Sequence, residues 1–269
     1  MRRVFQTIFR PLHVPVIALL LGGCSSLGKI NLISEQEELQ MGAQFAEQLK
    51  TELKFIDDPE TNAYIDRLGQ SIAKASQRNN IPYHFFVVDS DEVNAFAVPG
   101  GYLYVNRGLI EAAANESELA GVMGHEIGHI VGRHSARQMS QQYGISILAG
   151  LALGQNPNML AELTAQILAN GALSSYSREM EAEADKYGVQ ELYDVGIDPN
   201  GLPTFFDKLR AMEEQAGAGG SGGIDKYFSS HPNTADRAAA TRAQIAQLPP
   251  KSNLRLNSPE FQKIKLKFS

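Results

Sequence analysis

Two histidines and a glutamate stand at the spacing of a metal-binding helix, in the segment His125-Glu126-Ile127-Gly128-His129. Residues four apart share one face of a helix, so both imidazoles can bind the same ion. Glu126 projects beside that ion, within reach of a water molecule bound to it. The motif predicts a zinc-dependent hydrolase of peptide bonds, in which zinc lowers the pKa of the water and Glu126 takes its proton.

A catalytic zinc site needs a third protein ligand and one open position. We expect the third ligand from Glu181, in an acidic segment that ends at Asp185. Asp185 lies four positions later on the same face and is expected to hydrogen-bond a ligating imidazole and fix its tautomer. Glu179 and Glu183 are expected on other faces of that helix. These residues predict one Zn²⁺ per chain; a purely structural zinc, closed by four ligands, is the alternative.

Two glycines, Gly124 and Gly128, lie inside the predicted metal-binding helix. Each weakens a helix by about 1 kcal/mol relative to alanine, so together they predict close packing near the metal or the substrate. Two other histidines are given no part in the chemistry. His134, nine positions after His125, is expected on the helix surface, and His84 is expected to be structural at the start of a strand.

The first 23 residues have the pattern of an export signal. Arginines precede an apolar stretch, Val14 to Leu21, which is far too short to cross a bilayer because that needs about 20 apolar residues. Small residues then lead to Cys24, as in the lipobox of a bacterial lipoprotein. We expect lipidation of Cys24 and tethering to a membrane; an ordinary signal peptide with an incidental cysteine is the alternative. Ser25 is compatible with sorting to the outer membrane of a diderm bacterium.

Composition excludes several classes of protein and site. Cys24 is the only cysteine, so an intramolecular disulfide and a zinc site built from several cysteines are both excluded. The net charge of -6 argues against nucleic-acid binding, because neutralising phosphates requires a basic stripe. The hydrophobic fraction of 43% is sufficient for a sizeable core.

The patterning predicts an α+β fold that is mainly helical, with the HExxH helix in a helical body. Helices are predicted at 34–53, 59–76, from Asn115 through the metal motif, in two pieces within 145–173, and at 178–195, 202–215 and 234–248. Aromatic and β-branched runs predict strands at 83–88, 94–97 and 102–105, joined in a small antiparallel sheet. Along the chain we expect a signal peptide (1–23), a lipidated tether (24–33), a zinc metallopeptidase domain (34–248) and a C-terminal tail (249–269).

Three segments have two interpretations each. Residues 145–173 form either packed core helices, which we favour, or a lid or membrane-facing hairpin. The segment from Ala95 to Val98 is either a core strand or a sheet edge that binds an extended peptide by strand addition. The segment from Gly217 to Gly223 is either a connector or a loop that lets His231 move in and out of the site.

Four segments resemble the zinc metallopeptidases of family forty-eight, which includes HtpX-like proteases and the CAAX prenyl proteases. They are 94–101, 125–129, 177–185 and 230–232, and the similarity extends from about Ser34 to Leu248. The periplasmic lipoprotein branch, with LoiP-like and BepA-like members, is the most similar, and it implies a gluzincin-like fold. The resemblance implies that His125, His129 and Glu181 bind zinc. It also implies that Glu126 is the catalytic base and that Asp185 is an auxiliary residue.

The resemblance also implies that His231 approaches the zinc in the resting state. For the donor that holds the developing oxyanion we favour His231 over Arg178. Polypeptide substrates are implied, namely misfolded or unassembled envelope proteins, at the periplasmic inner face of the outer membrane and near its assembly machinery. A chaperone or assembly factor for outer-membrane proteins, with latent protease activity, is the alternative.

Overall fold

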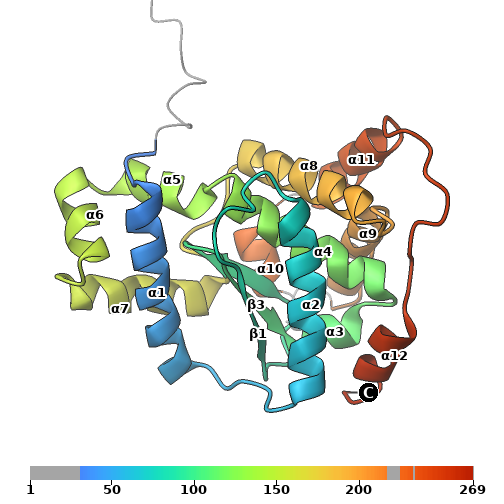
Figure 1. Ribbon diagram of the computed structural model, residues 1–269, viewed down its shortest axis with the longest axis horizontal. Coiled ribbons are helices and arrows are strands. Elements are labelled where there is room, and N and C mark those ends of the chain that lie inside the picture. The colour runs from blue at the N-terminus through green and yellow to red at the C-terminus, as the bar shows by residue number, and fades with distance from the viewer. Residues whose placement is uncertain (1–30, 217–224, 233, 269) are drawn as a thin grey trace, which may run out of the picture.

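The computed structural model describes residues 31–216, 225–232 and 234–268 of the chain (Figure 1). The predictions for the signal peptide, for Cys24 and its tether up to residue 30, and for the glycine-rich segment 217–223 lie outside the described residues. Within them, one three-stranded sheet stands in a mainly helical body, which confirms the expected α+β class. None of the described helices combines the length and the apolar character needed to span a membrane.

The first two helices, α1 (Glu35–Glu52) and α2 (Pro59–Ala75), begin within one residue of their predicted starts. The Ser34 hydroxyl accepts from the backbone N–H of Glu37, and the Glu37 carboxylate accepts from the backbone N–H of Ser34. This reciprocal pair satisfies two donors that the first helical turn leaves open. Asp58 caps α2 by accepting from the backbone N–H of Thr61, and a proline stands in the first turn.

The sheet consists of β1 (His84–Val88), β2 (Ala95–Val98) and β3 (Tyr102–Asn106), in the order β1-β3-β2. β2 and β3 are antiparallel and are joined by a turn whose two glycines, Gly100 and Gly101, have positive φ. β1 pairs with β3 in parallel, so the expectation of a purely antiparallel sheet was wrong. The chain reverses once before β2 and once after it, so β1 and β3 run in the same direction. β3 is the middle strand and pairs with β2 on one side and with β1 on the other.

Helices cover both faces of this sheet. One face, which includes Leu103 and Val105, packs against α2 and against α4 (Glu116–Val131). The opposite face, which includes Phe96 and Tyr104, packs against α1. Because successive side chains point to opposite faces of a strand, covering both faces buries all four residues of β2.

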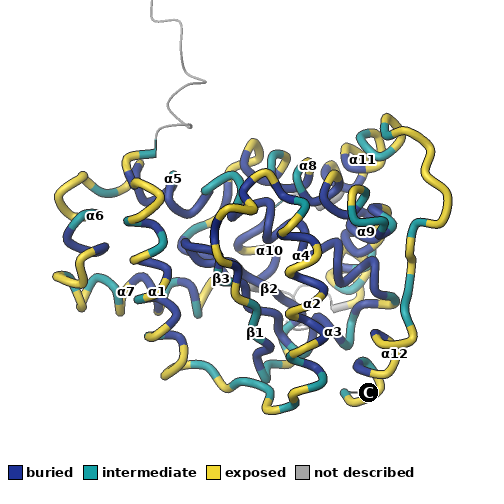
Figure 2. The backbone as a smooth tube through the Cα atoms, in the orientation of Figure 1, coloured by how far each residue is buried: buried dark blue, intermediate teal, exposed yellow. Residues whose placement is uncertain are grey.

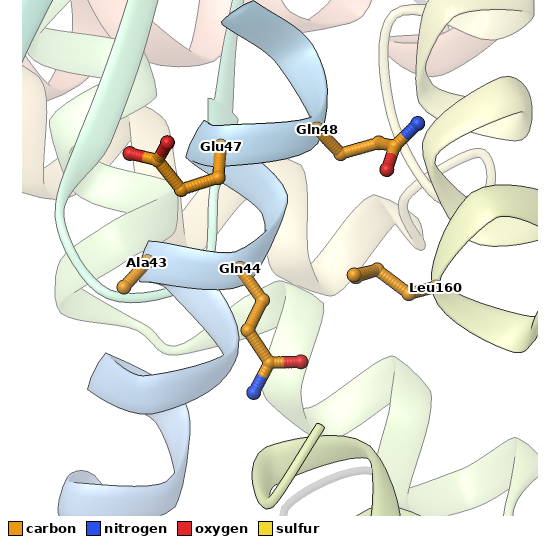
Figure 3. Close-up of a pocket in the computed structure, with 5 residues that line it drawn as sticks. All are labelled: Ala43, Gln44, Glu47, Gln48 and Leu160. Atoms are coloured by element: carbon orange, nitrogen blue, oxygen red, sulfur yellow. The ribbon is translucent and has the colours of Figure 1, made fainter. Parts of the chain in front are cut away.

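Residues 145–173 form the two predicted helices, α6 (Ile145–Ala152) and α7 (Pro157–Asn170). Leu151 and Ile167 are buried in the same cluster as the apolar face of α1, so the favoured interpretation of core packing is confirmed for this face. Ile145 remains 64% exposed at the start of α6. A groove of about 410 Å³ remains between α1 and α7; it is lined by Ala43, Gln44, Glu47, Gln48 and Leu160 (Figure 3).

Seven further helices complete the described fold. They are α3 (Arg107–Ala112), α5 (His134–Gln142), α8 (Arg178–Asp194), α9 (Gly201–Ala216), α10 (Asp225–Ser230), α11 (Thr234–Ile245) and α12 (Pro259–Lys265). The short helices α3, α5, α10 and α12 were not predicted, because one or two turns carry too little periodicity to be recognised. α4 and α8 lie side by side, and Figure 2 shows α4 buried along almost its whole length.

The residues after Leu248 also pack against the helical body. Arg255 lies 2.5 Å from the buried carboxylate of Glu116. Phe261 and Ile264 of α12 are buried in the cluster that includes the apolar face of α2. This C-terminal segment therefore contributes to the main hydrophobic core.

Candidate metal centre

Four side chains from three parts of the chain converge on one point. His125 and His129 come from α4, Glu181 from α8, and His231 directly follows α10. One ligand atom from each lies within 4.8 Å of all the others, and all four residues are buried. The structure thus brings together the three predicted zinc ligands and the histidine expected to approach them.

The spacing between these atoms suits a single ion. His125 Nε2 lies 3.0 Å from His129 Nε2, and His129 Nε2 lies 3.3 Å from the nearer Glu181 oxygen. His231 Nδ1 lies 3.2 Å from His125 Nε2. Protein ligands of zinc stand about 2 Å from the ion, so atoms about 3 Å apart can share one. Two imidazoles and a carboxylate are also the donor types that catalytic zinc prefers, so these residues fit the metal.

Close contact between α4 and α8 makes this convergence geometrically feasible. A Cβ atom at Gly128 would lie 2.5 Å from the carbonyl oxygen of Ala184, and one at Gly188 would lie 2.9 Å from the backbone nitrogen of His125. At Gly124, a Cβ would meet the side chain of Leu192 at 2.5 Å. The prediction that Gly124 and Gly128 serve close packing is therefore confirmed, because a larger residue would push α8 and its carboxylates away.

Glu126 faces the same point from the side. Its carboxylate is buried, and Oε1 makes no hydrogen bond to the described residues. The Nε2 atom of His231 lies 3.4 Å from that oxygen. His231 therefore directs Nδ1 toward the ligand cluster and Nε2 toward Glu126, and occupies the space between them.

Asp185 holds the ring of His125. Its Oδ1 atom lies 2.8 Å from His125 Nδ1, which is the nitrogen on the far side from the cluster. Arg237 of α11 donates to both oxygens of Asp185, over 2.7 and 2.8 Å, and also forms an ion pair with Glu181. Asp185 thus stands where the sequence placed it, and a buried arginine fixes it from behind.

Arg237 is a site residue that sequence reasoning missed. The guanidinium is 7% exposed and lies over the ring of Phe206, 4.3 Å from its centre. Arg178, the expected alternative for the oxyanion donor, is exposed at the start of α8. The only sequence signal for Arg237 was its place six residues after His231, in a helix otherwise rich in alanine.

His134 is buried, so the expectation that it lies on the helix surface was wrong. Gly132 ends α4, and Arg133 then adopts a left-handed conformation with φ 53°, which turns α5 back over the end of the metal helix. His134 Nδ1 consequently lies 2.8 Å from His129 Nδ1. Tyr176 was also missed; its ring stacks on His129 with the centres 3.9 Å apart.

The β2 strand lies beside this centre and at the edge of the sheet. A cavity of about 10 Å³, roughly the space of one water molecule, is lined by Ala97, Val98 and Pro99 together with His129 and Ser135. The 95–98 segment is thus a buried strand, and the described residues place no further strand on its outer side, so peptide binding by strand addition stays a prediction. A peptide needs far more room than this cavity provides.

Burial and charge act in opposite directions on the acidic groups. Burial raises the pKa of Glu126 above its ordinary value, against the effect of His231 and His125. Burial also acts to raise the pKa of Glu181, but His231 and Arg237 hold it well below the usual range. The pKa of Asp185 is likewise lowered, because Arg237 outweighs burial. Glu181 is thus ionised and able to bind a cation, whereas Glu126 is the carboxyl group whose proton affinity is raised.

The pKa values of His129 and His231 shift in opposite directions. Burial lowers the pKa of His129 well below its ordinary value, so its ring is neutral, as a metal ligand must be. Burial also disfavours the charged form of His231, but the nearby carboxylates of Glu181 and Glu126 raise its pKa.

Comparison with known proteins agrees with this arrangement. A model of peptidase family M48 matches residues 59–245. The chain is 33% identical over 227 residues to the beta-barrel assembly-enhancing protease of Escherichia coli (strain K12), which covers 81% of this chain and 46% of that protein. A putative beta-barrel assembly-enhancing protease of Vibrio cholerae is 32% identical over 250 residues, covering 89% and 49%. Metalloprotease YcaL of Escherichia coli (strain K12) is 33% identical over 192 residues, covering 69% and 72%.

The fold places the HExxH motif on a buried central helix, beside a cluster of four buried side chains that could hold a metal ion. The chain belongs to peptidase family M48, as the sequence resemblance predicted. It spans about half the length of the beta-barrel assembly-enhancing proteases that it matches.

Proposed function

We propose that this metalloprotease is a zinc-dependent endopeptidase that cleaves misfolded or unassembled proteins of the cell envelope. The observation that carries the chemistry is the convergence of His125, His129 and Glu181 on one point, with the carboxylate of Glu126 beside it. A bound zinc ion supplies Lewis acidity, which lowers the pKa of a water molecule and polarises the scissile carbonyl.

The side chains of the site have separable roles in this proposal. Glu126 accepts a proton from the attacking water and later passes it to the leaving amine; its raised pKa suits a group that must hold a proton between the two steps. Asp185, fixed by Arg237, keeps the proton of His125 on Nδ1 and so leaves Nε2 free for the metal. Once His231 moves away from the ligand cluster, its ring is the donor nearest to the developing negative charge of the oxyanion.

The described conformation fits a resting form of the enzyme. His231 Nδ1 lies 3.0 Å from Glu181 and 3.2 Å from His125 Nε2, so it would be a fourth ligand of an ion held by His125, His129 and Glu181. Catalytic zinc keeps that position open for water and substrate. His231 therefore acts as a brake until it is displaced, and the same ring then serves as the oxyanion donor.

The location and substrates are proposed from sequence and relatives. The signal-like residues 1–23 and Cys24 support a lipoprotein that is anchored in the periplasm at the inner face of the outer membrane. The names of the beta-barrel assembly-enhancing proteases connect those relatives with outer-membrane assembly. On that basis we propose envelope proteins as substrates and the assembly machinery as a neighbour.

Digestion of casein by the purified protein tests the chemistry. We expect cleavage that is abolished by a zinc chelator, restored by added zinc, and lost in Glu126→Gln, which keeps the volume of the side chain but removes the base. The variant should still bind zinc, because the three proposed ligands are unchanged. Cleavage that survives both the chelator and Glu126→Gln would refute the proposed mechanism.

A second candidate function is a chaperone or assembly factor for outer-membrane proteins, with latent protease activity. The observation that favours it is the closed site, in which His231 stands between Glu126 and the ligand cluster. The two candidates differ in what Glu126→Gln does in cells. Loss of envelope-protein turnover supports the protease, whereas normal outer-membrane assembly by the inactive variant supports the chaperone.

A further inference from the structure

The two proposed metal-binding histidines have outer partners of different chemical types. His125 Nδ1 faces the carboxylate of Asp185 at 2.8 Å. His129 Nδ1 faces another imidazole, that of His134, also at 2.8 Å. A carboxylate accepts a hydrogen bond in any orientation, whereas an imidazole accepts only at a nitrogen that carries no proton. The contact between His129 and His134 therefore constrains where both rings hold their protons.

The proton positions follow from the direction of each ring. His129 Nε2 points at the ligand cluster, 3.3 Å from Glu181 and 3.0 Å from His125 Nε2, so a neutral His129 that binds a metal there carries its proton on Nδ1. That Nδ1–H needs an acceptor, which is the unprotonated Nδ1 of His134. Neutral His134 must then carry its own proton on Nε2.

Glu183 is placed to accept a hydrogen bond from the Nε2–H group of His134. Its Oε2 atom lies 3.2 Å from His134 Nε2 and accepts a further hydrogen bond from Arg137 Nη1 over 2.7 Å. The ion pair with Arg137 supports the ionised form of Glu183, which accepts hydrogen bonds and donates none. The reverse arrangement would place two N–H groups of His129 and His134 against each other.

The local backbone is built around the His134 ring. A Cβ atom at Gly132 would lie 2.3 Å from His134 Nε2, so a residue larger than glycine at the end of α4 would collide with the imidazole. Arg133, in its left-handed conformation, then brings His134 over the last turn of the metal helix. His134 is fully buried in this position.

We propose that His134 and Glu183 form a hydrogen-bonded relay that fixes the tautomer of His129 and directs its Nε2 atom to the metal. His134 is a positioning residue in this relay, because it acts through His129 and touches neither metal nor substrate. The inference rests on the proposed metal site. It gives each metal-binding histidine its own anchor on α8, Asp185 for His125 and Glu183 for His129.

Replacement of His134 separates hydrogen bonding from packing. In His134→Asn, the amide oxygen takes the place of Nδ1 and still accepts from His129, whereas His134→Leu fills the space without an acceptor. We expect His134→Leu to weaken zinc binding about 10- to 100-fold, the usual loss when an outer partner of a metal ligand is removed. His134→Asn should bind zinc as the wild type does. Glu183→Leu should also weaken binding, because it frees the tautomer of His134.

Zinc affinity is measured by competition with a chromophoric chelator, and the melting temperature of the metal-free protein is measured in parallel. His84→Leu, which replaces an exposed histidine at the start of β1, is the control for the loss of any histidine. The spectrum of the cobalt-substituted protein reports the geometry of the ligands and should change in His134→Leu alone of the two His134 variants. On casein, the loss in His134→Leu is expected in kcat rather than in KM.

Equal zinc affinity in the wild type, His134→Leu and Glu183→Leu would overturn the relay. Equal weakening in His134→Leu and His134→Asn would overturn it as well, because packing rather than an acceptor would then be responsible. If His134→Leu does not fold, Glu183→Leu carries the same test, since its side chain is partly exposed. A wild-type protein that binds no zinc in this titration would refute the proposed function itself, and the relay with it.

Discussion

At the scale of single residues, the centre has more parts than its motif. The motif residues and Glu181 converge as the sequence predicted, because helical spacing fixes which side chains share a face. Arg237 and His134 were not foreseen, since their contacts depend on how α11 and α5 turn back onto α4. Local spacing therefore predicts groups that share a helix, such as Glu181 and Asp185, but not the buried partners that other helices bring to the site.

His231 offers the first test at this scale. In the described conformation its Nδ1 atom fills the fourth ligand position and its Nε2 atom faces Glu126. We expect His231→Ala to retain zinc on the three remaining ligands and to cleave casein faster than the wild type, because the opening of the site to water and substrate outweighs the loss of the ring as an oxyanion donor. The readouts are the rate of casein cleavage and the zinc content. A slower rate with full zinc content would show that the ring serves mainly as an oxyanion donor.

Glu191 leads to a prediction about pH. It is 3% exposed, neither oxygen has a hydrogen-bond partner among the described residues, and burial raises its pKa well above the ordinary value. The folded state therefore binds a proton that the unfolded state releases at lower pH, so stability falls as the pH rises above the unfolded pKa of about 4.5. Glu191→Met removes this loss of stability. At pH 7 the free energy of unfolding of the variant should be higher than that of the wild type by about 1–3 kcal/mol.

The pH dependence of that gain distinguishes the proposed cause from ordinary packing. Denaturant unfolding of the metal-free wild type and Glu191→Met, at pH 5 and at pH 7.5, gives the difference in unfolding free energy. It should be larger at pH 7.5, because the wild type alone has a group to deprotonate. A difference that stays constant with pH would contradict the titration of Glu191.

At the scale of elements, the contact between α4 and α8 sets the geometry of the site. Both helices begin within one residue of their predicted starts, and the side chains of Asn115 and Ser177 accept from the backbone N–H groups of Glu118 and Met180. Their glycines bring the two backbones together, and this carries Glu181 and Asp185 to the histidines. The sequence predicted both helices and the need for close packing, but it contained no information about which helix would fill the space.

Gly128→Ala tests whether this contact controls metal binding. Alanine favours an isolated helix over glycine by about 1 kcal/mol. Here its Cβ would lie 2.5 Å from the backbone of Ala184, which cannot rotate away as a side chain would. We expect a net loss of about 1–3 kcal/mol in unfolding free energy, typical of overpacking, together with weaker zinc binding because α8 must shift.

Gly144→Ala is the matched control for that substitution. A Cβ atom at Gly144 meets nothing within 4 Å, and the backbone there has an ordinary φ of −73°. It should cost about 0.5 kcal/mol or less and leave zinc affinity unchanged. Equal effects of the two substitutions, in denaturant unfolding and in chelator competition, would exclude the α4–α8 contact as the cause.

The sheet marks another limit of prediction from sequence. All three strands were placed within one or two residues, because β-branched and aromatic runs between turn residues are a strong local signal. The parallel pairing of β1 with β3 was missed. The length and burial of a strand can be predicted from its own sequence. Which strand it pairs with depends on how the connection between strands crosses the sheet.

At the scale of the whole molecule, the path of the N-terminal segment bears on where the enzyme works. Asn31 and Leu32 are held at α5, where the backbone N–H of Leu32 donates to Ser140 over 2.9 Å. Asn31 lies seven positions after Cys24, with six residues between them. An extended chain of that length spans at most about 25 Å, so a lipid on Cys24 would keep the metalloprotease domain close to a membrane surface.

Cys24→Ser tests the proposed anchor in cells. Without the thiol no acyl chains can be attached, so we expect the variant to appear in the soluble periplasmic fraction, whereas the wild type sediments with outer membranes. The mass of the purified wild-type protein should show a lipid-modified N-terminal cysteine. Ser26→Ala is the control and should leave both the modification and the membrane location unchanged.

The same variant separates anchoring from catalysis. Casein cleavage by purified Cys24→Ser should equal that of the wild type, because the proposed chemistry is assigned to residues of the described domain, which begins after Cys24. Cleavage of envelope proteins in cells should fall, since the tether no longer concentrates the enzyme at the membrane. If Cys24→Ser still sediments with outer membranes, some other feature of the chain holds it there and the lipid anchor is refuted, while the proposed chemistry at His125, Glu126 and His129 would stand unaffected.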